Sequence, residues 1–337
     1  MEKSSYGYPL PLKIIGMGRC LPERIVPSSE LEKECNLPPG WCRQKQGIRE
    51  RRWFSKDEYE KLSYASIGAA AAKEAVENAK VSLAEIDLLL HASSLYDRVT
   101  PDQSVQLLQE LGLGERGIPS MSINCACLSF MAALDISSAL ITTGLYRNIL
   151  IVSEIITSHG LHSDNPLVYT MMGDGAAAMV VTRAAEGESS KVNAVLMETY
   201  STASDVSSFL TDAEHRTAFT KEIYSEDFAF DFNAKSMQNA GVHYNQNFLK
   251  KLWPGDRNSF KLIIPNQSTR LPIDMMKLEY PADRVVGIID RFGNLGAVGY
   301  MLALEEAVRG DRIKRGDLVL MHGMGPGFSI MGLVFTY

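Results

Sequence analysis

The sequence is poor in cysteine and has neither a long apolar run nor a strong excess of charge of one sign. Its cysteines are an odd number without the spacing of a disulfide framework: Cys20, Cys35, Cys42, Cys125 and Cys127. This pattern predicts reduced thiols and a cytoplasmic location. Because no stretch of about 18 apolar residues occurs, no membrane span is expected. The first residues, MEKSSYGYPLPLKIIGMG, are mixed and interrupted by proline, unlike a secretory signal peptide.

The formal net charge of −6 is spread without a long block of one sign, which argues against nucleic acid as the main partner. A length of 337 residues fits two domains or one large duplicated unit with an ample core. Cys125 and Cys127 have no second cysteine or histidine group at metal-ligand spacing, so we expect no metal site.

Strand-like and helix-like patterns alternate along the chain. Helices are predicted over 63–79, 101–113, 127–144, 232–253 and 295–310. Strands are predicted over 86–94, 120–125, 148–155, 173–184, 191–202, 261–267, 284–290, 318–325 and 328–337. Such an order indicates an α/β fold with largely buried strands. The second half repeats the order of the first, which predicts two duplicated halves, residues 1–185 and 186–337, joined near EGESSK.

Cys127 stands at the start of a long apolar helix-like segment, where a predicted strand turns into a helix. Backbone N–H groups and the positive end of the helix dipole would face its sulfur and lower the pKa of the thiol. A thiolate there would be a nucleophile in a dry, narrow site. The alternative is that Cys125 and Cys127 are both small core residues. The two should point in different directions, and Cys125 fits the core better.

Polar motifs follow three buried segments, at positions where ligands gather in α/β sheets. They are PNQ at 265–267, FGNLGA at 292–297 and GMGPGF at 323–328. Asn266 and Asn294 carry amide N–H groups that can donate hydrogen bonds to a developing oxyanion. A single asparagine after a strand is most often a turn residue, but the combination with the cysteine favours an active site.

Six motifs occur in order: GIRERRW at 47–53, CACLSF at 125–130, GDGAAA at 173–178, NQ at 266–267, FGNLGAV at 292–298 and GMGPGF at 323–328. They resemble the motifs of β-ketoacyl-ACP synthase III-type condensing enzymes of the thiolase superfamily, over nearly the whole chain. The resemblance implies a thiolase-like five-layered αβαβα fold, usually a homodimer. It also implies that Cys127 accepts an acyl group from acyl-CoA or acyl carrier protein, with no tightly bound cofactor. Claisen condensation with a malonyl-type or β-ketoacyl thioester then follows.

The sequence departs from this family at the second catalytic position, where Asn266 replaces histidine. Asparagine donates a hydrogen bond but cannot carry charge or exchange a proton near neutral pH. Loss of such a group typically costs ~10²-fold or more in rate. His322, just before GMGPGF, is a candidate substitute base, with a structural residue of the strand as the favoured alternative. Pro326 lacks the backbone N–H that many relatives supply to the oxyanion hole, which then rests on Cys127, Asn266 and Asn294.

The resemblance also implies a binding site for the thioester donor. Trp41 stands where relatives stack a tryptophan on the CoA adenine, and Thr269 stands where they often contact pantetheine. The other candidates for substrate or carrier-protein contacts are Lys45, Arg49, Arg52, Arg270 and Gly325. A solvated surface is the alternative interpretation for the basic residues.

Two other functions remain open. One is transfer of the acyl group to an alcohol or amine in secondary metabolism, which the missing histidine favours. The other is a non-catalytic partner subunit of an active ketosynthase, against which the retained Cys127 argues. Condensation is the preferred prediction because Asn266 and Asn294 can both bind an enolate oxygen.

Overall fold

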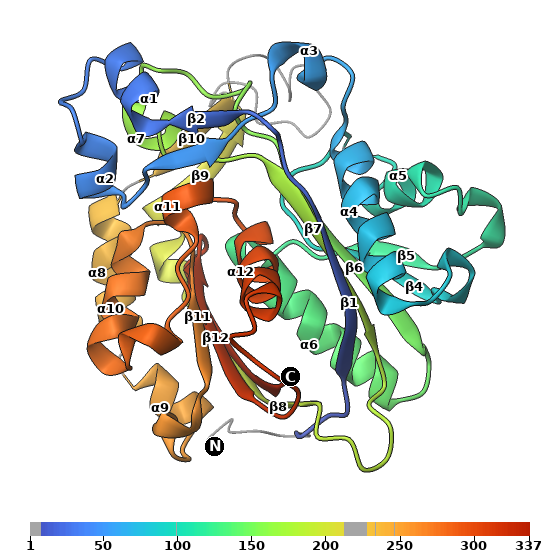
Figure 1. Ribbon diagram of the computed structural model, residues 1–337. Helices are drawn as coiled ribbons and strands as arrows, with labels where there is room; N and C mark the ends of the chain where they lie inside the picture. Colours follow the sequence, from blue (N-terminus) through green and yellow to red (C-terminus); the bar gives the residue numbers. More distant parts are fainter. Residues whose placement is uncertain (1–7, 99, 212–227, 233, 246) are drawn as a thin grey trace.

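Two mixed β-sheets form the centre of the molecule (Figure 1). The computed structural model describes residues 8–98, 100–211, 228–232, 234–245 and 247–337. The first sheet has the strand order β1-β7-β6-β4-β5. Its strands are β1 (Lys13–Cys20), β4 (Leu88–His91), β5 (Ser120–Ser122), β6 (Asn148–Ile155) and β7 (Gly175–Thr182). β4 runs parallel to β5 and β6, whereas β7 is antiparallel to β1 and β6.

The second sheet has the strand order β11-β12-β13-β8. Its strands are β8 (Lys191–Thr199), β11 (Leu262–Pro265), β12 (Leu318–Gly325) and β13 (Ser329–Thr336). β11 and β12 are parallel, and the other pairs are antiparallel. Two short pairs lie outside both sheets: β2 (Ile25–Pro27) with β3 (Glu50–Arg52), and β9 (Ser207–Thr211) with β10 (Phe228–Phe232).

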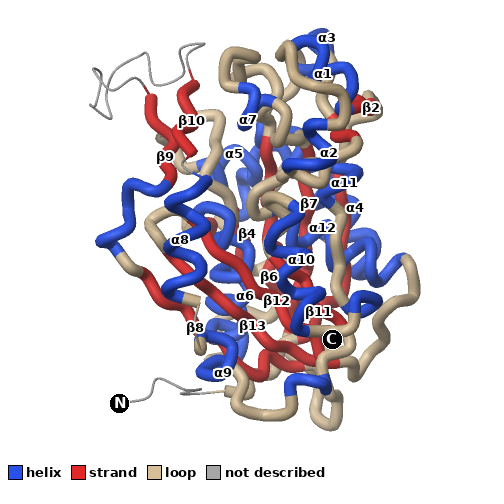
Figure 2. The backbone as a smooth tube through the Cα atoms, turned by 90° about the vertical axis from the view of Figure 1, so that its left-hand side faces the viewer, coloured by secondary structure: helices blue, strands red, loops and turns tan. Residues whose placement is uncertain are grey.

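Helices form three layers around these sheets (Figures 1 and 2). α4 (Tyr64–Ala79) and α5 (Gln103–Glu110) cover the outer face of the first sheet. α6 (Ser129–Thr142) and α12 (Val298–Arg309) lie between the two sheets. α8 (Ala234–Tyr244), α9 (Phe248–Leu252) and α10 (Arg270–Glu279) cover the outer side of the second sheet, which faces the viewer in Figure 2. The layers follow the αβαβα order that the resemblance implies.

Five shorter helices connect these layers: α1 (Ser28–Glu34), α2 (Trp41–Lys45), α3 (Lys56–Tyr59), α7 (Pro166–Tyr169) and α11 (Ile289–Phe292). Within the described part of the chain, none of the helices has the length and apolar character needed to cross a membrane.

The middle layer is apolar because each of its helices has a sheet on either side. α6 buries Phe130, Met131 and Leu134, and α12 buries Met301 and Leu304. A helix that is apolar on most of its surface belongs in the interior. All eight residues of β6 are buried for the same reason, since helices cover both faces of its sheet. Residues at the ends of the central strands and at the starts of these helices therefore lie deep in the molecule.

The strand predicted over 284–290 is wrong. Val285 makes one isolated bridge to Ile263, and α11 begins at Ile289. The side chain of Gln267 supplies the contacts that a strand partner would make. Its amide nitrogen donates to a backbone carbonyl of this segment over 3.1 Å, and its oxygen accepts from the Ile288 N–H over 2.9 Å. An apolar run alone could not reveal this side-chain pairing.

The single helix predicted over 232–253 is also wrong. The described residues of this range form two helices, α8 and α9, while residues 233 and 246 lie outside the described residues. Asn247 has a positive φ of 63°, which a continuous right-handed helix does not contain. The other predicted helices and strands are confirmed, with ends that differ by a few residues.

Candidate active site

Cys127 lies in a short turn that leads into α6. Residues Ala126–Leu128 form a 3₁₀ turn, hereafter the cysteine turn. Ala126 has a positive φ of 51°, which is uncommon for a residue with a Cβ atom. The hydroxyl of Ser129 holds the turn, because it accepts from the Cys125 N–H over 2.9 Å and donates to the Ala126 carbonyl over 2.7 Å. The turn thus places Cys127 at the N-terminal end of a buried helix.

The prediction of a lowered pKa for the Cys127 thiol is wrong. Burial raises its pKa to about 11, and hydrogen bonding to the backbone N–H of Cys127 opposes this only in part. Cys125 also has a raised pKa because of burial, and it packs half-buried against the core. Cys127 is therefore a neutral thiol near pH 7, and it becomes a nucleophile only when it loses its proton.

The end of β12 contacts the cysteine turn. A Cβ atom on Gly325 would lie 3.4 Å from Cγ of Leu128, so the terminal glycine loop lies directly against the turn. Asn266 follows β11, and its Nδ2 donates to the Met324 carbonyl over 2.7 Å. Because β11 and β12 are parallel neighbours, their carboxyl ends meet here. The structure thus brings together the cysteine turn, Asn266 and Gly325.

Asn266 is 5% exposed, so its amide has little contact with solvent. The amide has two N–H donors, of which the Met324 carbonyl uses one. The second can donate to a ligand oxygen. An amide does not titrate near neutral pH, so Asn266 cannot accept the proton of Cys127.

Asn294 lies in the loop between α11 and α12 and is 7% exposed. Its Oδ1 accepts from the Gly296 N–H over 2.9 Å, which orients the amide and leaves Nδ2 as a donor. Its backbone N–H donates to the Met171 carbonyl over 2.8 Å, and its carbonyl accepts from the Gly173 N–H over 3.1 Å. These bonds fix the loop in front of α12, the helix that also carries Tyr300.

His322 points to the face of the second sheet opposite to α12. Side chains alternate along a strand, and the neighbouring Gly323 contacts Tyr300 of α12. The His322 ring instead lies 5.5 Å from the Phe248 ring, and its Nε2 is 3.0 Å from Oδ1 of Asn245. Burial lowers the pKa of His322 to about 4. This geometry favours the structural alternative over a substitute base.

Tyr300 is the residue of this site that sequence analysis missed. It lies in the first turn of α12 and is completely buried. A Cβ atom on Gly323 would lie 1.6 Å from its hydroxyl oxygen and 3.3 Å from Cβ of Asn266. Burial raises the pKa of this phenol, and an ionised Cys127 would raise it further. In an apolar helix a tyrosine of the active site cannot be distinguished by sequence from a tyrosine of the core. The sequence therefore gave no sign that Tyr300 lies beside Asn266.

Four of the predicted donor-binding residues lie where α2 meets α10. α2 carries Trp41 and Lys45, and α10 begins with Arg270 directly after Thr269. The backbone N–H of Arg270 donates to the Gln46 carbonyl over 2.8 Å, which joins the two helix ends. Lys45 and Arg270 are exposed, and Trp41 and Thr269 are half-buried. These residues form one edge of the molecule.

The arginines among the predicted binding residues make contacts within the protein. Arg49 pairs with Asp290 over 2.8 Å, and Arg270 pairs with Asp274 over 2.8 Å. Both pairs are exposed, and such pairs contribute little to stability. Arg52 donates to a backbone carbonyl over 2.8 Å. To bind a phosphate group of the substrate, Arg49 and Arg270 would thus have to give up their ion pairs with Asp290 and Asp274.

Two charged residues of the sequence motifs have structural contacts instead. Arg51 of GIRERRW is fully buried and donates to the Thr170 carbonyl over 2.5 Å. Asp174 of GDGAAA accepts from the Phe54 N–H over 3.1 Å and from the Thr157 N–H over 2.9 Å. Buried charges of this kind need such partners. These two residues connect loops around the first sheet.

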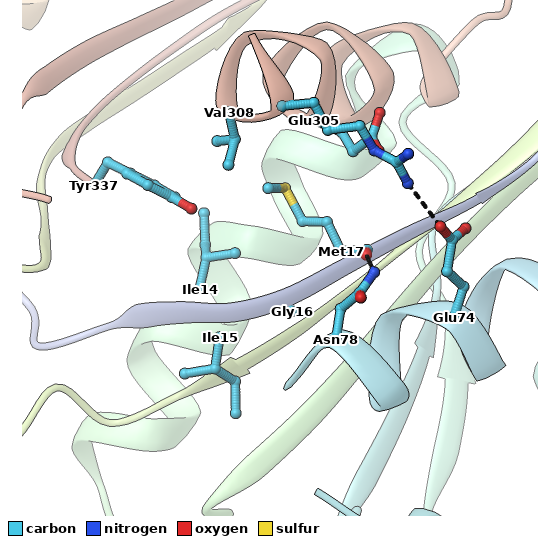
Figure 3. A pocket seen from close by; sticks show the side chains of 10 residues that line it. Ile14, Ile15, Gly16, Met17, Glu74, Asn78, Glu305, Val308 and Tyr337 are labelled. Carbon is cyan, nitrogen blue, oxygen red and sulfur yellow. Dashed lines mark hydrogen bonds and ion pairs between the residues drawn. The ribbon is translucent and has the colours of Figure 1, made fainter. Parts of the chain in front are cut away.

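A cavity of about 530 Å³ lies between β1, α4 and α12 (Figure 3). Its lining includes Glu74, Glu305 and Arg309, and Arg309 forms ion pairs with both glutamates. This lining shares no residue with the cysteine turn or with the predicted site residues. Over the residues that the structure describes, no three His, Cys, Asp or Glu side chains are grouped as potential metal ligands.

Comparisons with known proteins show which proteins this sequence resembles. The model of 3-oxoacyl-[acyl-carrier-protein (ACP)] synthase III matches residues 121–201, and the model of its C-terminal part matches residues 256–337. Over 333 residues the chain is 28% identical to β-ketoacyl-[acyl-carrier-protein] synthase III of Aquifex aeolicus, which covers 96% of this chain and 99% of that protein.

Solved structures show the same architecture. The 3-oxoacyl-[acyl-carrier-protein] synthase III of Aquifex aeolicus VF5 superposes with a TM-score of 0.82 at 25% identity, over 97% of this chain and 100% of that one. A histidine-to-asparagine variant of OleA from Xanthomonas campestris superposes with a TM-score of 0.83 at 16% identity, over 97% and 98% of the two chains. The chain therefore has the thiolase-like fold, as predicted.

Proposed function

We propose that the chain is a condensing acyltransferase of the 3-oxoacyl-[acyl-carrier-protein] synthase III family, to which its sequence and fold are similar, with Cys127 as nucleophile. It takes an acyl group from acyl-CoA or acyl carrier protein and joins it to a malonyl-type or β-ketoacyl thioester. The observation that carries this proposal is the meeting of the cysteine turn, Asn266 and the terminal glycine loop at the ends of β11 and β12.

The first step is acylation of Cys127. Its sulfur attacks the carbonyl carbon of the donor thioester, the bond from that carbon to the donor sulfur breaks, and an acyl-Cys127 thioester forms. The departing thiolate takes up the proton that Cys127 loses, so a free donor thiol leaves. A thiol with a pKa of about 11 is a strong nucleophile once ionised. It remains protonated, and so protected from side reactions, before the donor arrives.

The second step is condensation. The bond between the α-carbon and the carboxylate of the malonyl thioester breaks, CO₂ leaves, and an enolate forms. The enolate carbon attacks the carbonyl of acyl-Cys127, the C–S bond breaks, and a β-ketoacyl thioester is released with the Cys127 thiolate. We assign stabilisation of the developing oxyanions to Nδ2 of Asn294, the free N–H of Asn266 and the backbone N–H of Cys127. The fixed orientation of the Asn294 amide supports this assignment.

We assign delivery of the donor to the edge formed by α2 and α10. Trp41 offers an aromatic face there, and Lys45 offers an exposed cation. α10 adds an apolar stripe, in which Leu271, Met275 and Leu278 are 43%, 49% and 82% exposed. Their spacing places them on one face of the helix. Exposed apolar side chains beside basic residues fit a protein surface, so we propose that acyl carrier protein docks on α10.

We further propose a homodimer. β5 is an edge strand of the first sheet, and its Met121 is 43% exposed. An edge strand can pair with the same strand of a second copy. We also propose the division into halves at residues 185 and 186, which lies between the last strand of the first sheet and the first strand of the second. The cytoplasmic location and the lack of a metal or tightly bound cofactor stay predictions.

Mass spectrometry of the intact protein tests the proposed function. The chain is incubated with a panel of acyl-CoAs and acyl carrier proteins, with Cys127→Ala as the control, and malonyl-CoA is then added. We expect an acyl adduct on the unmodified chain alone, which disappears as a β-ketoacyl product forms.

Other outcomes separate the alternatives. An adduct that persists with malonyl-CoA but is discharged by an alcohol or amine would support acyl transfer, which the neutral amide of Asn266 also permits. The absence of an adduct with every donor would contradict the enzyme hypothesis and favour a non-catalytic partner subunit.

A further inference from the structure

Tyr300 brings a phenol into the site formed by the cysteine turn, Asn266 and the end of β12. Its hydroxyl lies 1.6 Å from the position of a Cβ atom on Gly323, and Cβ of Asn266 lies 3.3 Å from the same position. The same end of β12 contacts the cysteine turn, because a Cβ atom on Gly325 would lie 3.4 Å from Cγ of Leu128. The hydroxyl therefore lies among the groups that carry the proposed reaction, and not in a remote part of the core.

The hydroxyl has a poor hydrogen bond within the protein. The one bond that the described residues provide runs to the His322 carbonyl over 3.5 Å. Hydroxyl donors normally approach their acceptors to about 2.7–2.8 Å, and a buried tyrosine usually has such a partner. The Tyr64 hydroxyl, for comparison, donates to the Ile156 carbonyl over 2.6 Å. A substrate oxygen would give Tyr300 the short partner that the protein does not supply.

The phenol is a donor that keeps its proton. Burial raises the pKa of Tyr300 well above its ordinary value, and an ionised Cys127 would raise it further. The O–H group therefore stays intact over the pH range in which enzymes work. Such a group stabilises an oxyanion by a hydrogen bond without transferring a proton.

The side chains of Asn266 and Tyr300 both lie beside Gly323 at the end of β12. The Asn266 side chain is short, and its amide is held by the Met324 carbonyl over 2.7 Å. This leaves room in which the phenol reaches Gly323, where the lack of a Cβ atom removes the last obstacle. A histidine at position 266 has a wider ring and would compete with the hydroxyl for this volume. The short asparagine and the long tyrosine are therefore complementary in shape.

We propose that Tyr300 is a catalytic residue that donates a hydrogen bond to the thioester oxygen of the malonyl-type substrate as this oxygen becomes an enolate. This role rests on the proposed condensing function. When the bond to the carboxylate breaks, CO₂ leaves and the electron pair moves onto the thioester oxygen, which Tyr300 binds. The enolate carbon then attacks acyl-Cys127, the thioester carbonyl forms again, and the Tyr300 proton stays on the phenol throughout.

The test compares two half-reactions of the full chain carrying Tyr300→Phe. Acylation of Cys127 by acyl-CoA is followed by rapid quench and mass spectrometry. Condensation is followed as CO₂ and β-ketoacyl product after malonyl-CoA is added to the acylated protein. We expect acylation within about twofold of the unmodified chain and condensation slowed ~10²-fold, the typical cost of one oxyanion donor. Tyr64→Phe is the matched control, because it removes a part-buried hydroxyl outside the site and should change neither rate.

A second variant tests whether a histidine at position 266 can replace the hydroxyl of Tyr300 as hydrogen-bond donor. Asn266→His is introduced into the Tyr300→Phe background, where the volume of the hydroxyl is free for an imidazole N–H. We expect this double variant to recover at least about tenfold of the lost condensation rate, since one donor replaces another. A merely structural role for Tyr300 would not produce this recovery.

Each outcome decides the inference. Equal condensation rates for the unmodified chain and Tyr300→Phe overturn it and leave the condensing function intact. Equal losses in acylation and condensation without rescue by Asn266→His indicate a structural role and also overturn it. An unmodified chain that is acylated but never condenses contradicts the proposed function itself, and the role of Tyr300 falls with it.

Discussion

The hydroxyl of Tyr300 occupies the space that a Cβ atom on Gly323 would need, because the two positions lie only 1.6 Å apart. Gly323 belongs to β12 and Tyr300 to α12, so this contact joins the second sheet to the middle helical layer. The residues around Gly323 and Tyr300 in the sequence give no sign that the two are in contact. The contact is made at the end of β12, next to Asn266.

Gly323→Ala should destabilise the protein through this contact. Gly323 does not have a positive φ, so the expected cost comes from overpacking against Tyr300 and not from the backbone. We expect the free energy of unfolding to fall by about 1–3 kcal/mol. Tyr300→Phe should relieve part of this loss, although a ring carbon still lies 2.9 Å from the added atom. A double-mutant cycle from denaturant unfolding measures the coupling, and additive effects would contradict the contact.

Asn294→Asp should separate folding from catalysis. The aspartate keeps an oxygen that can accept from the Gly296 N–H, now 2.9 Å from Oδ1 of Asn294, so the melting temperature should change little. The substitution removes the Nδ2 donor and adds negative charge near a developing oxyanion. We expect the condensation rate to fall ~10²–10³-fold. A variant that condenses at the rate of the unmodified chain would exclude Asn294 from the oxyanion site.

The reactivity of Cys127 should rise steeply with pH. Its pKa of about 11 means that the thiolate is a small fraction of the thiol at pH 7. Alkylation by iodoacetamide should therefore speed up about tenfold per pH unit between pH 7 and 10, since only the thiolate reacts. Brief pulses followed by peptide mass spectrometry identify the modified residue, with Cys127→Ala as the control. A rate that levels off below pH 9 would show that the thiol is not held neutral by burial.

His322 should make the protein sensitive to acid. Burial lowers its pKa from 6.5 to about 4 in the folded chain, so the unfolded chain binds a proton first as the pH falls. The contribution of neutral His322 to the free energy of unfolding is thus fully present above pH 6.5 and is lost as the pH falls towards 4. We expect unfolding by urea to report a loss of up to about 3 kcal/mol from this group. His322→Gln should remove that part of the pH dependence, and an unchanged profile would contradict the assignment.

The apolar stripe on α10 should affect acylation by acyl carrier protein but not acylation by acyl-CoA. Leu278 is 82% exposed, so Leu278→Glu should leave the fold intact. We expect the KM for acyl carrier protein to rise about tenfold, because a charge in the docking surface must be desolvated. Acylation by acyl-CoA should stay within about twofold. Leu145→Glu is the matched control, since Leu145 is 63% exposed outside α10. Equal effects of both variants, or none, would place docking elsewhere.

Much of the fold could be predicted because local patterns and buried surfaces agree. α4 follows a capping serine and a run of helix formers, and β6 is a continuous apolar run covered on both sides. The segment 284–290 is equally apolar but forms no strand, because the side chain of Gln267 binds its backbone. Hydrogen bonding of a distant side chain leaves no trace in an apolar pattern.

The sequence by itself determined the order of elements, the two polar asparagines after buried segments and the cysteine at the start of a helix, since these depend on local composition and spacing. Only the tertiary structure decided the environment of these groups. The pKa of Cys127 is raised because surrounding elements remove water from its sulfur, and this outweighs the hydrogen bond to its backbone N–H. The position of Tyr300 beside Gly323 depends on how α12 packs against β12. Such contacts join residues that are distant in the chain, and no local pattern specifies them.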